Sequence, residues 1–358
     1  QAPLANRVSA NIGTFLDEWK TRGMSWTTWI EEVENARSQF ARLIGTREEH
    51  IAVGSSVSQL VSSVASALMA SSTPGKRVIS SVVEFPGVAH AWLAMQKHGW
   101  SVDILPADER GLVTAETFAA AIDPETVLVS MPHVCYGHGA RIDPEPVVEQ
   151  AHRNEALVFV DGYQSLGTIP IDVHESKVDF LAAGSLKYLL GTAGIAFLYV
   201  NPQIRERLEP TVTGWFGRSA PFAFQPEVLD YAESAARFDL GTPPLISAYA
   251  ARAGLELILN TGVEQIYEQI QRLSRHAYEL APRLGLRIWG PERAEAKGAT
   301  TAIDAGSTER AHALEDALRS RGVIVSARGS VVRLAPHGFI AVEELEQALH
   351  FVAELSHV

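Results

Sequence analysis

Cysteine is almost absent from this sequence of 358 residues, which contains only Cys135. One cysteine cannot form an intramolecular disulfide or supply a cysteine-rich structural metal site. Basic residues are outnumbered, 30 against 42 acidic ones, and form no run, which argues against nucleic acid or an anionic membrane as the main partner. No apolar stretch reaches the roughly 18 residues of a membrane span, and Gln1 begins no signal peptide. These absences predict a soluble, cytoplasmic protein.

The residues that are present predict a folded protein with a sizeable core. Hydrophobic residues make up 46% of the chain and charged residues 20%. The length suits one large domain and a smaller one. Apolar positions at helical spacing predict helices within residues 1–45, which we assign to the small domain.

Residues 46–260 alternate between short apolar runs and helical patterns, with small or turn-forming residues between them. Strands that are apolar throughout, separated by helices, are typical of a mostly parallel sheet covered on both faces. The pattern therefore predicts a large α/β domain. Its expected strands are Ile51–Val53, Arg77–Val83, Ser101–Leu105, Thr126–Met131, Ala156–Val160, Phe180–Ala183 and Gly194–Val200.

Residues 261–358 have a different pattern, in which helices accompany shorter strands. This predicts a small α+β domain at the C-terminus. Its expected strands are Arg287–Trp289, Ala299–Ile303, Val323–Val325 and Val331–Leu334, with helices at Glu309–Arg321 and Val342–Leu355.

The segment from Val158 to Val200 carries the most specific chemistry. One apolar strand ends in Asp161, and Lys187 follows 26 residues later in a turn flanked by Gly and Ser. Ligands of open α/β sheets bind at the carboxyl ends of strands. Alone, Asp161 is typical of a turn and Lys187 of a solvated side chain. Together they suit pyridoxal 5′-phosphate (PLP): the lysine forms a Schiff base, and the carboxylate keeps the pyridine nitrogen protonated.

These motifs resemble those of the class V, fold-type I PLP-dependent enzymes, which include cysteine desulfurases, kynureninases and small aminotransferases. The resemblance covers nearly the whole chain. It is carried by Asp-Gly-x-Gln at 161–164, by the interval to Lys187, and by Lys-x-x-x-Gly-x-x-Gly-x-x-x-Leu-Tyr-Val, which ends at Val200. It implies a seven-stranded, mostly parallel sheet in the large domain and a small α+β C-terminal domain.

The resemblance also implies residues that bind the phosphate. Ser56 and Val57 lie in the turn that opens a helix, where free N–H groups and the helix dipole favour an anion. The family usually has a hydroxyl at the position of Val57, so only its backbone can contribute. Ser185 would reach the same phosphate, whereas Leu186 replaces a family donor. Ser56 alone is equally typical of an ordinary N-cap.

Other matching positions surround the cofactor ring and the substrate. Phe85 would stack on the pyridine ring, although a core phenylalanine is the alternative. Gln164 resembles the glutamine that hydrogen-bonds the phenolic oxygen. Arg333 matches an arginine that binds the substrate α-carboxylate, the alternative being a solvated arginine.

The resemblance implies a homodimer with shared active sites through one further segment, and a phosphate contact in another. Thr242, in Gly-Thr-Pro, matches a threonine that reaches the phosphate of the neighbouring subunit. Trp215, in Gly-Trp-Phe-Gly, would touch the phosphate or serve as a buried structural residue. The chain begins at Gln1 like a family member just after its N-terminal Asn- and Gly-containing segment, so we expect that segment to be missing from the sequence.

The resemblance implies an enzyme acting on an amino acid, with Lys187 as the general base at Cα. We predict an aminotransferase. The alternatives are a PLP-dependent lyase, kynureninase-like or cleaving a carbon–sulfur bond, and a non-catalytic protein of the same fold. A cysteine desulfurase is disfavoured because Cys135 lies outside the C-terminal third that holds the family's persulfide-forming cysteine. His133 and His138 are too weak a pattern to predict a metal.

Overall fold

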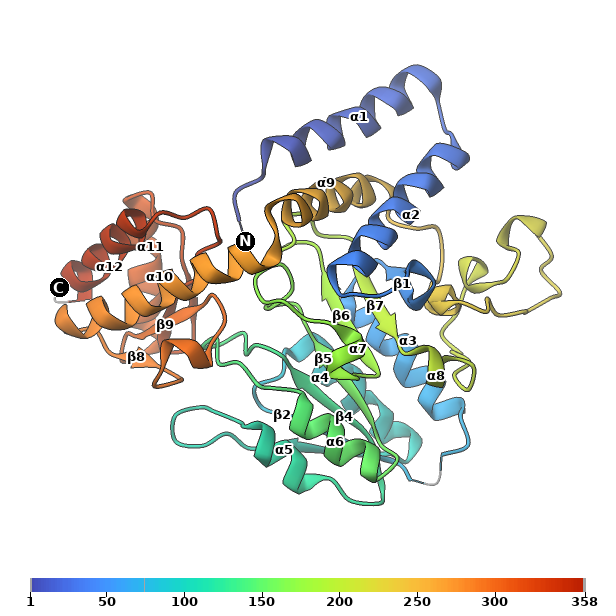
Figure 1. Cartoon of the computed structure of the whole chain (residues 1–358), viewed down its shortest axis with the longest axis horizontal. Helices are drawn as coiled ribbons and strands as arrows, with labels where there is room; N and C mark the ends of the chain where they lie inside the picture. Colours follow the sequence, from blue (N-terminus) through green and yellow to red (C-terminus); the bar gives the residue numbers. More distant parts are fainter. Residues whose placement is uncertain (1, 74, 357–358) are drawn as a thin grey trace.

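A seven-stranded sheet forms the centre of the larger part of the molecule in the computed structural model, which describes residues 2–73 and 75–356 (Figure 1). Its strand order is β1-β7-β6-β5-β4-β2-β3. The pairs from β6 to β3 are parallel, and β7 runs antiparallel to both of its neighbours, β6 and β1. The prediction of a mostly parallel seven-stranded sheet is thus confirmed. The strands are β1 (Ile51–Gly54), β2 (Arg77–Ser81), β3 (Ser101–Leu105), β4 (Thr126–Pro132), β5 (Leu157–Asp161), β6 (Phe180–Gly184) and β7 (Ala196–Val200).

Helices cover both faces of this sheet because its central strands are apolar on both sides. On one face α3 and α4 pack against the strands, and Trp92 of α4 meets Phe159 with ring centroids 5.6 Å apart. On the other face α2, α5, α6 and α9 pack, and Phe40 stacks on Phe197 at 4.6 Å. The helices are α1 (Asn6–Arg22), α2 (Trp26–Leu43), α3 (Val57–Ala70), α4 (Pro86–Ala94), α5 (Ala115–Ala121), α6 (Glu145–Arg153), α7 (Val173–Ser176), α8 (Pro202–Arg205) and α9 (Leu245–Thr261).

The N-terminal helices differ from the expectation that residues 1–45 would join the small domain. Both α1 and α2 pack on α9, and Figure 1 shows them away from the C-terminal part. The buried face of α2, from Val33 to Ile44, shares the core of the large sheet. Helical spacing reveals that a helix has an apolar face, but it does not reveal which surface that face covers.

A second, antiparallel sheet with the order β10-β11-β9-β8 forms the smaller part. The strand expected over Val323–Val325 instead occupies Ser326–Arg328, because those residues pair with β11. The elements are α10 (Val263–Arg283), β8 (Ile288–Trp289), β9 (Thr301–Asp304), α11 (Thr308–Ser320), β10 (Ser326–Arg328), β11 (Val331–Leu334) and α12 (Val342–Ser356).

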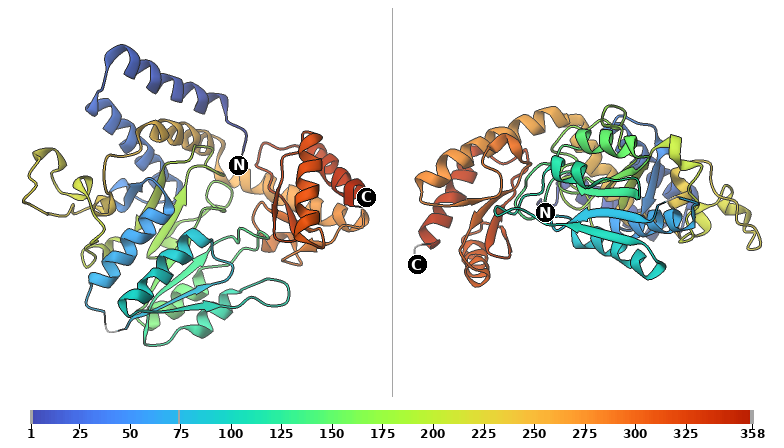
Figure 2. Two further views of the ribbon diagram at one scale, coloured as in Figure 1. Left: turned by 180° about the vertical axis from the view of Figure 1, so that it is seen from behind. Right: turned by 90° about the horizontal axis from the view of Figure 1, so that it is seen from below.

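Helix α10 joins the two parts (Figure 2). Val263, Ile266 and Ile270 belong to the core of the large sheet, whereas Leu273 and Ala277 belong to the core of the small one. We therefore propose that the small domain comprises residues 261–358. No helix in the described part of the chain combines the length and the apolar character that crossing a membrane requires.

A buried ion pair fixes α2 to β1 and to the segment before α9. Arg37 donates to Asp239 at 2.8 Å, and Asp239 also accepts from the Val53 N–H at 2.7 Å. Asp239→Ala would leave Arg37 buried without its main counterion, which costs about 3–5 kcal/mol. We expect a loss of that size in the free energy of unfolding measured with urea. Asp316→Ala, which removes an exposed partner of Arg319, is the control and should cost less than about 1 kcal/mol. Equal losses in the two variants would contradict the prediction.

Candidate active site

Asp161 and Lys187 meet at the carboxyl edge of the parallel strands. Asp161 is the last residue of β5, and Lys187 lies in the turn between β6 and β7. The Asp161 carboxylate accepts from the Tyr163 N–H at 2.8 Å, which turns the chain away from the strand. The neighbouring Gly162 N–H still donates to Ala182 of β6. The predicted juxtaposition therefore follows from adjacent parallel strands that end at one edge.

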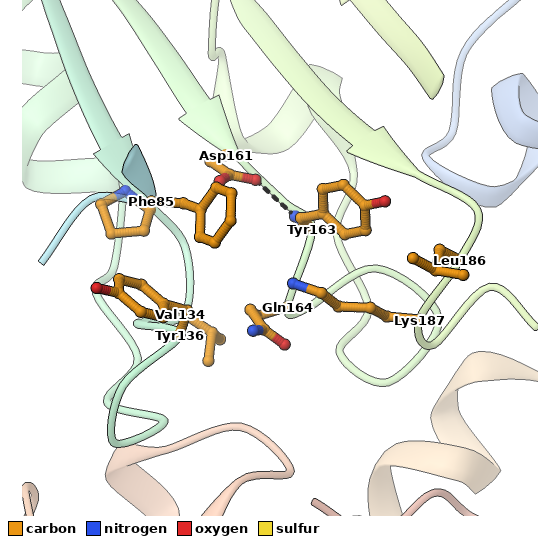
Figure 3. A pocket seen from close by; sticks show the side chains of 9 residues that line it. Phe85, Val134, Tyr136, Asp161, Tyr163, Gln164, Leu186 and Lys187 are labelled. Carbon is orange, nitrogen blue, oxygen red and sulfur yellow. Dashed lines mark hydrogen bonds between the residues drawn. The ribbon is translucent and has the colours of Figure 1, made fainter. Parts of the chain in front are cut away.

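The Lys187 side chain reaches into a cavity of about 180 Å³, which we name the ring lobe. Its Nζ lies 4.3 Å from the ring centroid of Tyr163 and 5.6 Å from that of Phe85. Figure 3 shows the amino group pointing into the space beside Gln164. The lobe is lined by Phe85, Pro132, Val134, Tyr136, Asp161, Tyr163, Gln164, Leu186 and Lys187.

A second cavity of about 180 Å³, the phosphate lobe, shares Phe85, Asp161 and Tyr163 with the ring lobe. It is bounded by the N-terminus of α3, where Ser56 caps the helix by accepting from the Gln59 N–H at 3.2 Å. Its complete lining is Ser55, Ser56, Val57, Ser58, Phe85, Gly87, Val88, Asp161, Tyr163, Ala193, Gly194 and Ile195.

The α3 N-terminus leaves hydrogen-bond donors for an anion. The N–H groups of Val57 and Ser58 have no acceptor among the described residues. The Val57 side chain packs into the core, so only its backbone faces the lobe, as its apolar character implies. Free N–H groups at the positive end of a helix dipole bind phosphate. The lobe therefore offers the kind of donors that a phosphate accepts from.

Burial lowers the pKa of Lys187 to about 8. The negative charge of Asp161 opposes this shift, whereas the positive charges of Arg333 and Arg328 add to it. A larger fraction of the amino group is thus neutral near pH 7 than in a solvated lysine. The neutral amine is the form that can act as a nucleophile or accept a proton.

Two buried carboxyl groups interact next to the ring lobe: Asp161, which lines it, and Glu84, which precedes its lining residue Phe85. Burial raises the pKa of both, and the charge of Asp161 raises the pKa of Glu84 further. The neighbouring Lys187 and the N–H of Tyr163 offset the shift at Asp161. Glu84 accepts from the Phe85 N–H at 2.8 Å and from Ser130, but no cation opposes its shift. We infer that Glu84 holds the proton and Asp161 the charge.

Arg333 comes from β11 of the small sheet and lies beside the ring lobe. Its guanidinium donates to the backbone carbonyl of Tyr136 and to Ser326 Oγ, the latter at 2.7 and 3.2 Å. Tyr136 lines the ring lobe together with Lys187, and the positive charge of Arg333 lowers the pKa of that lysine. Arg333 therefore reaches from the small sheet to a loop that lines the same cavity as Lys187.

Three predicted contacts do not lie in the cavity. Ser185 is buried within its turn and its hydroxyl donates to the Thr192 carbonyl at 2.7 Å. Trp215 packs among aromatic rings, with its ring centroid 6.0 Å from that of Trp26. Thr242 is exposed. Ser185 and Trp215 make contacts within this chain. Thr242 is exposed, so a neighbouring molecule can contact it.

The sequence interpretation missed two rings and a carboxyl group at the site. Tyr163 lies under the Lys187 amino group, and Tyr136 meets Phe85 edge-on with ring centroids 5.4 Å apart. Glu84 ends an otherwise apolar run, Val82-Val83, directly before Phe85. A lone carboxyl group next to Phe85, a predicted ring contact, could have indicated that Glu84 belongs near the site. Nothing in the sequence indicated Tyr163 or Tyr136, because the geometry of their loops decides where the rings point.

Comparison with known proteins identifies the family of this chain. The family model for class-V aminotransferases matches residues 2–348. An uncharacterized aminotransferase, YcbU of Bacillus subtilis, is 38% identical over 99% of this chain and 92% of its own. A kynureninase of Geobacillus thermodenitrificans is 28% identical over 93% and 81%. The structure of a cysteine desulfurase from Thermococcus onnurineus superposes with a TM-score of 0.86 at 22% identity, covering 99% of this chain and 92% of its own. That structure shares the fold, which is fold-type I.

The residues of the two lobes fit PLP. The phosphate lobe offers unpaired N–H groups, and its glycines keep it open: a Cβ at Gly87 would lie 2.7 Å from Ser58 Oγ. The ring lobe offers Lys187, the face of Phe85 and the buried Asp161. The match over residues 2–348 and this donor set lead to one conclusion: the chain belongs to the class-V aminotransferase family, and its cofactor is pyridoxal 5′-phosphate.

Proposed function

We propose that this protein transfers the α-amino group of an amino acid to a keto acid. The observation that carries the proposal is the Lys187 amino group, which lies between the rings of Phe85 and Tyr163 with Asp161 and Arg333 near it. PLP, when bound, supplies a ring that accepts the electrons of a broken Cα bond. The chain has to hold that ring, orient the substrate and move one proton.

Each residue has a task in this proposal. Asp161 is placed to keep the ring nitrogen protonated, because its buried charge favours a positive partner. Arg333 would bind the substrate α-carboxylate as a two-pronged donor. The neutral amine of Lys187 would remove the proton from Cα of the substrate and donate it to a different atom. Ser56 and Val57 would hold the phosphate, Phe85 the ring face and Gln164 the phenolic oxygen.

Amino transfer is supported by the 38% identical relative that carries the name aminotransferase. A desulfurase would need an accessible cysteine, but the only one, Cys135, is buried, and burial raises the pKa of its thiol. A lyase is the second candidate. Phe85-Pro86 and the 28% identical kynureninase favour it.

Incubation of the PLP-loaded enzyme with a panel of amino acids distinguishes the two. We expect keto acid to form only when an amino acceptor such as pyruvate is present. Release of ammonia, sulfide or a cleaved side chain without an acceptor would instead establish a lyase. Purified protein that shows no cofactor absorbance after incubation with PLP and removal of the unbound PLP would refute both and leave a non-catalytic protein.

The lowered pKa of Lys187 predicts how the apoprotein captures PLP. Only the neutral amine attaches to an aldehyde, so the rate should rise about tenfold per pH unit and level off near pH 8. Stopped-flow absorbance measures this. Arg333→Gln removes a positive charge that lowers the pKa of Lys187, so its plateau should lie at higher pH. A wild-type rate that climbs unchanged to pH 10 would contradict the prediction.

We also propose that the protein is a cytoplasmic homodimer. Thr242 is exposed, and so is Phe224 at 71% on the segment beside Trp215, which suits contact with a second copy. Sedimentation should show a dimer. Thr242→Ala should weaken PLP binding by about tenfold without changing the dimer, since it would remove one hydrogen bond to a charged group. A monomer with full PLP affinity would refute the shared site.

A further inference from the structure

A second arginine lies on the same face of the small sheet as Arg333. In the β10–β11 hairpin, Ser326 stands directly opposite Arg333, and Arg328 follows Ser326 by two residues. Side chains two apart on a strand point to one face, so Arg328 and Arg333 are diagonal neighbours on it. Arg333 contacts the Tyr136 loop at the ring lobe, so this face is the one that meets the site.

The position of Arg328 is supported by its electrostatic effect. Its positive charge lowers the pKa of both Lys187 and Arg333, which agrees with the shared face given by the hairpin register. Arg328 is exposed to solvent, whereas Arg333 is half-buried.

Neither guanidinium is neutralised by a carboxylate among the described residues. Arg333 donates to a carbonyl and a hydroxyl, and Arg328 donates to the Ala327 carbonyl. Glu315, an acid that contacts this hairpin, accepts from the Ala327 N–H and pairs with Arg319. Clustered cations without counterions raise the energy of the protein and favour binding of an anion.

We infer that Arg328 and Arg333 form two carboxylate subsites and that the substrates are dicarboxylic amino acids and their keto acids. Arg333 binds the α-carboxylate next to Lys187. The solvent-exposed Arg328 binds the side-chain carboxylate. This inference rests on the proposed function, since it assumes that Arg333 faces the α-carboxylate. A neutral side chain would leave the charge of Arg328 uncompensated.

Binding of amine-free acids tests this independently of turnover. Calorimetry on the PLP-loaded protein would compare glutarate, with two carboxylates, with butyrate, which has one. We expect glutarate to bind at least tenfold tighter, because one hydrogen-bonded ion pair accounts for about that ratio. In Arg328→Gln the two acids should bind within about twofold of each other. Arg47→Gln, which changes an exposed arginine in the large domain, should keep the wild-type ratio.

Equal affinity of glutarate and butyrate in the wild type would overturn the inference, and so would an Arg328→Gln variant that weakens both acids alike. Turnover gives a second measurement: Arg328→Gln should lower kcat/KM for glutamate or aspartate at least tenfold and leave that for alanine within about twofold. Failure of the proposed function is seen differently, as the absence of acceptor-dependent keto acid with every amino acid. Selective glutarate binding would remain in that case.

Discussion

A Lys187→Ala variant should lose the visible absorbance of the lysine-bound cofactor and about 10⁴-fold in turnover. Alanine has no amine to carry PLP, and it leaves no group near Cα to move the proton. A well-placed general base contributes up to about 10⁴-fold. The cavity should persist, because Lys187 packs against the rings of Tyr163 and Phe85 without anchoring either by a hydrogen bond. Absorbance spectra and single-turnover kinetics measure the two losses.

Two controls distinguish the loss of the catalytic amine from misfolding of the variant. Lys97→Ala, at an exposed position, should keep both the absorbance and the turnover. Added methylamine should restore part of the turnover of Lys187→Ala, because a small amine fits the vacated space. A Lys187→Ala variant with normal absorbance and rate would remove this residue from the mechanism and the proposed function with it.

Asp161→Asn should lower turnover by about 10²–10³-fold while the visible absorbance remains. The amide preserves the shape and can still accept the Tyr163 N–H, but it carries no charge to hold a proton on the ring nitrogen. Preorganised charge of this kind contributes about that factor. The lysine still attaches PLP, so binding and catalysis separate in this variant. The measurement is kcat together with the spectrum of the bound cofactor.

Glu84→Gln is the matched control, since it neutralises the neighbouring buried carboxyl. If Glu84 already holds the proton, the amide should change turnover by less than about threefold. The pair therefore tests which carboxyl is charged. A large loss in Glu84→Gln with a small one in Asp161→Asn would reverse the assignment made from Lys187 and the Tyr163 N–H.

The predictable part of the site lies within one stretch of chain. Asp161 ends one apolar strand, and Lys187 follows the next strand along the chain, which also pairs with it in parallel. Both residues therefore lie at one edge of the sheet, and their spacing in the sequence was enough to predict this. The turn before α3 was predictable for the same reason, because a small-residue segment between a strand and a helix leaves its N–H groups free.

Side-chain direction was not predictable from the same motifs. Ser185 precedes Lys187 by two residues, yet its hydroxyl donates to Thr192 because the turn folds back on itself. Trp215 packs among Trp26, Phe222 and Phe224 and does not line either lobe. Such choices depend on packing partners that lie far away in the chain.

By itself, the sequence determined the α/β order of the large domain, the class of cofactor and the pair Asp161 and Lys187, because each depends on local periodicity and short spacing. Only the tertiary structure decided that α2 covers the large sheet, that α1 packs on α9 and that Glu84 lies near Asp161. It also decided that the hairpin of the small sheet brings Arg333 against Tyr136 of the ring lobe, with Arg328 on the same face of the hairpin. The single cysteine that marks the sequence proved to be a buried side chain. The physical reason is that contacts between distant elements follow from shape and burial, which no short segment encodes alone.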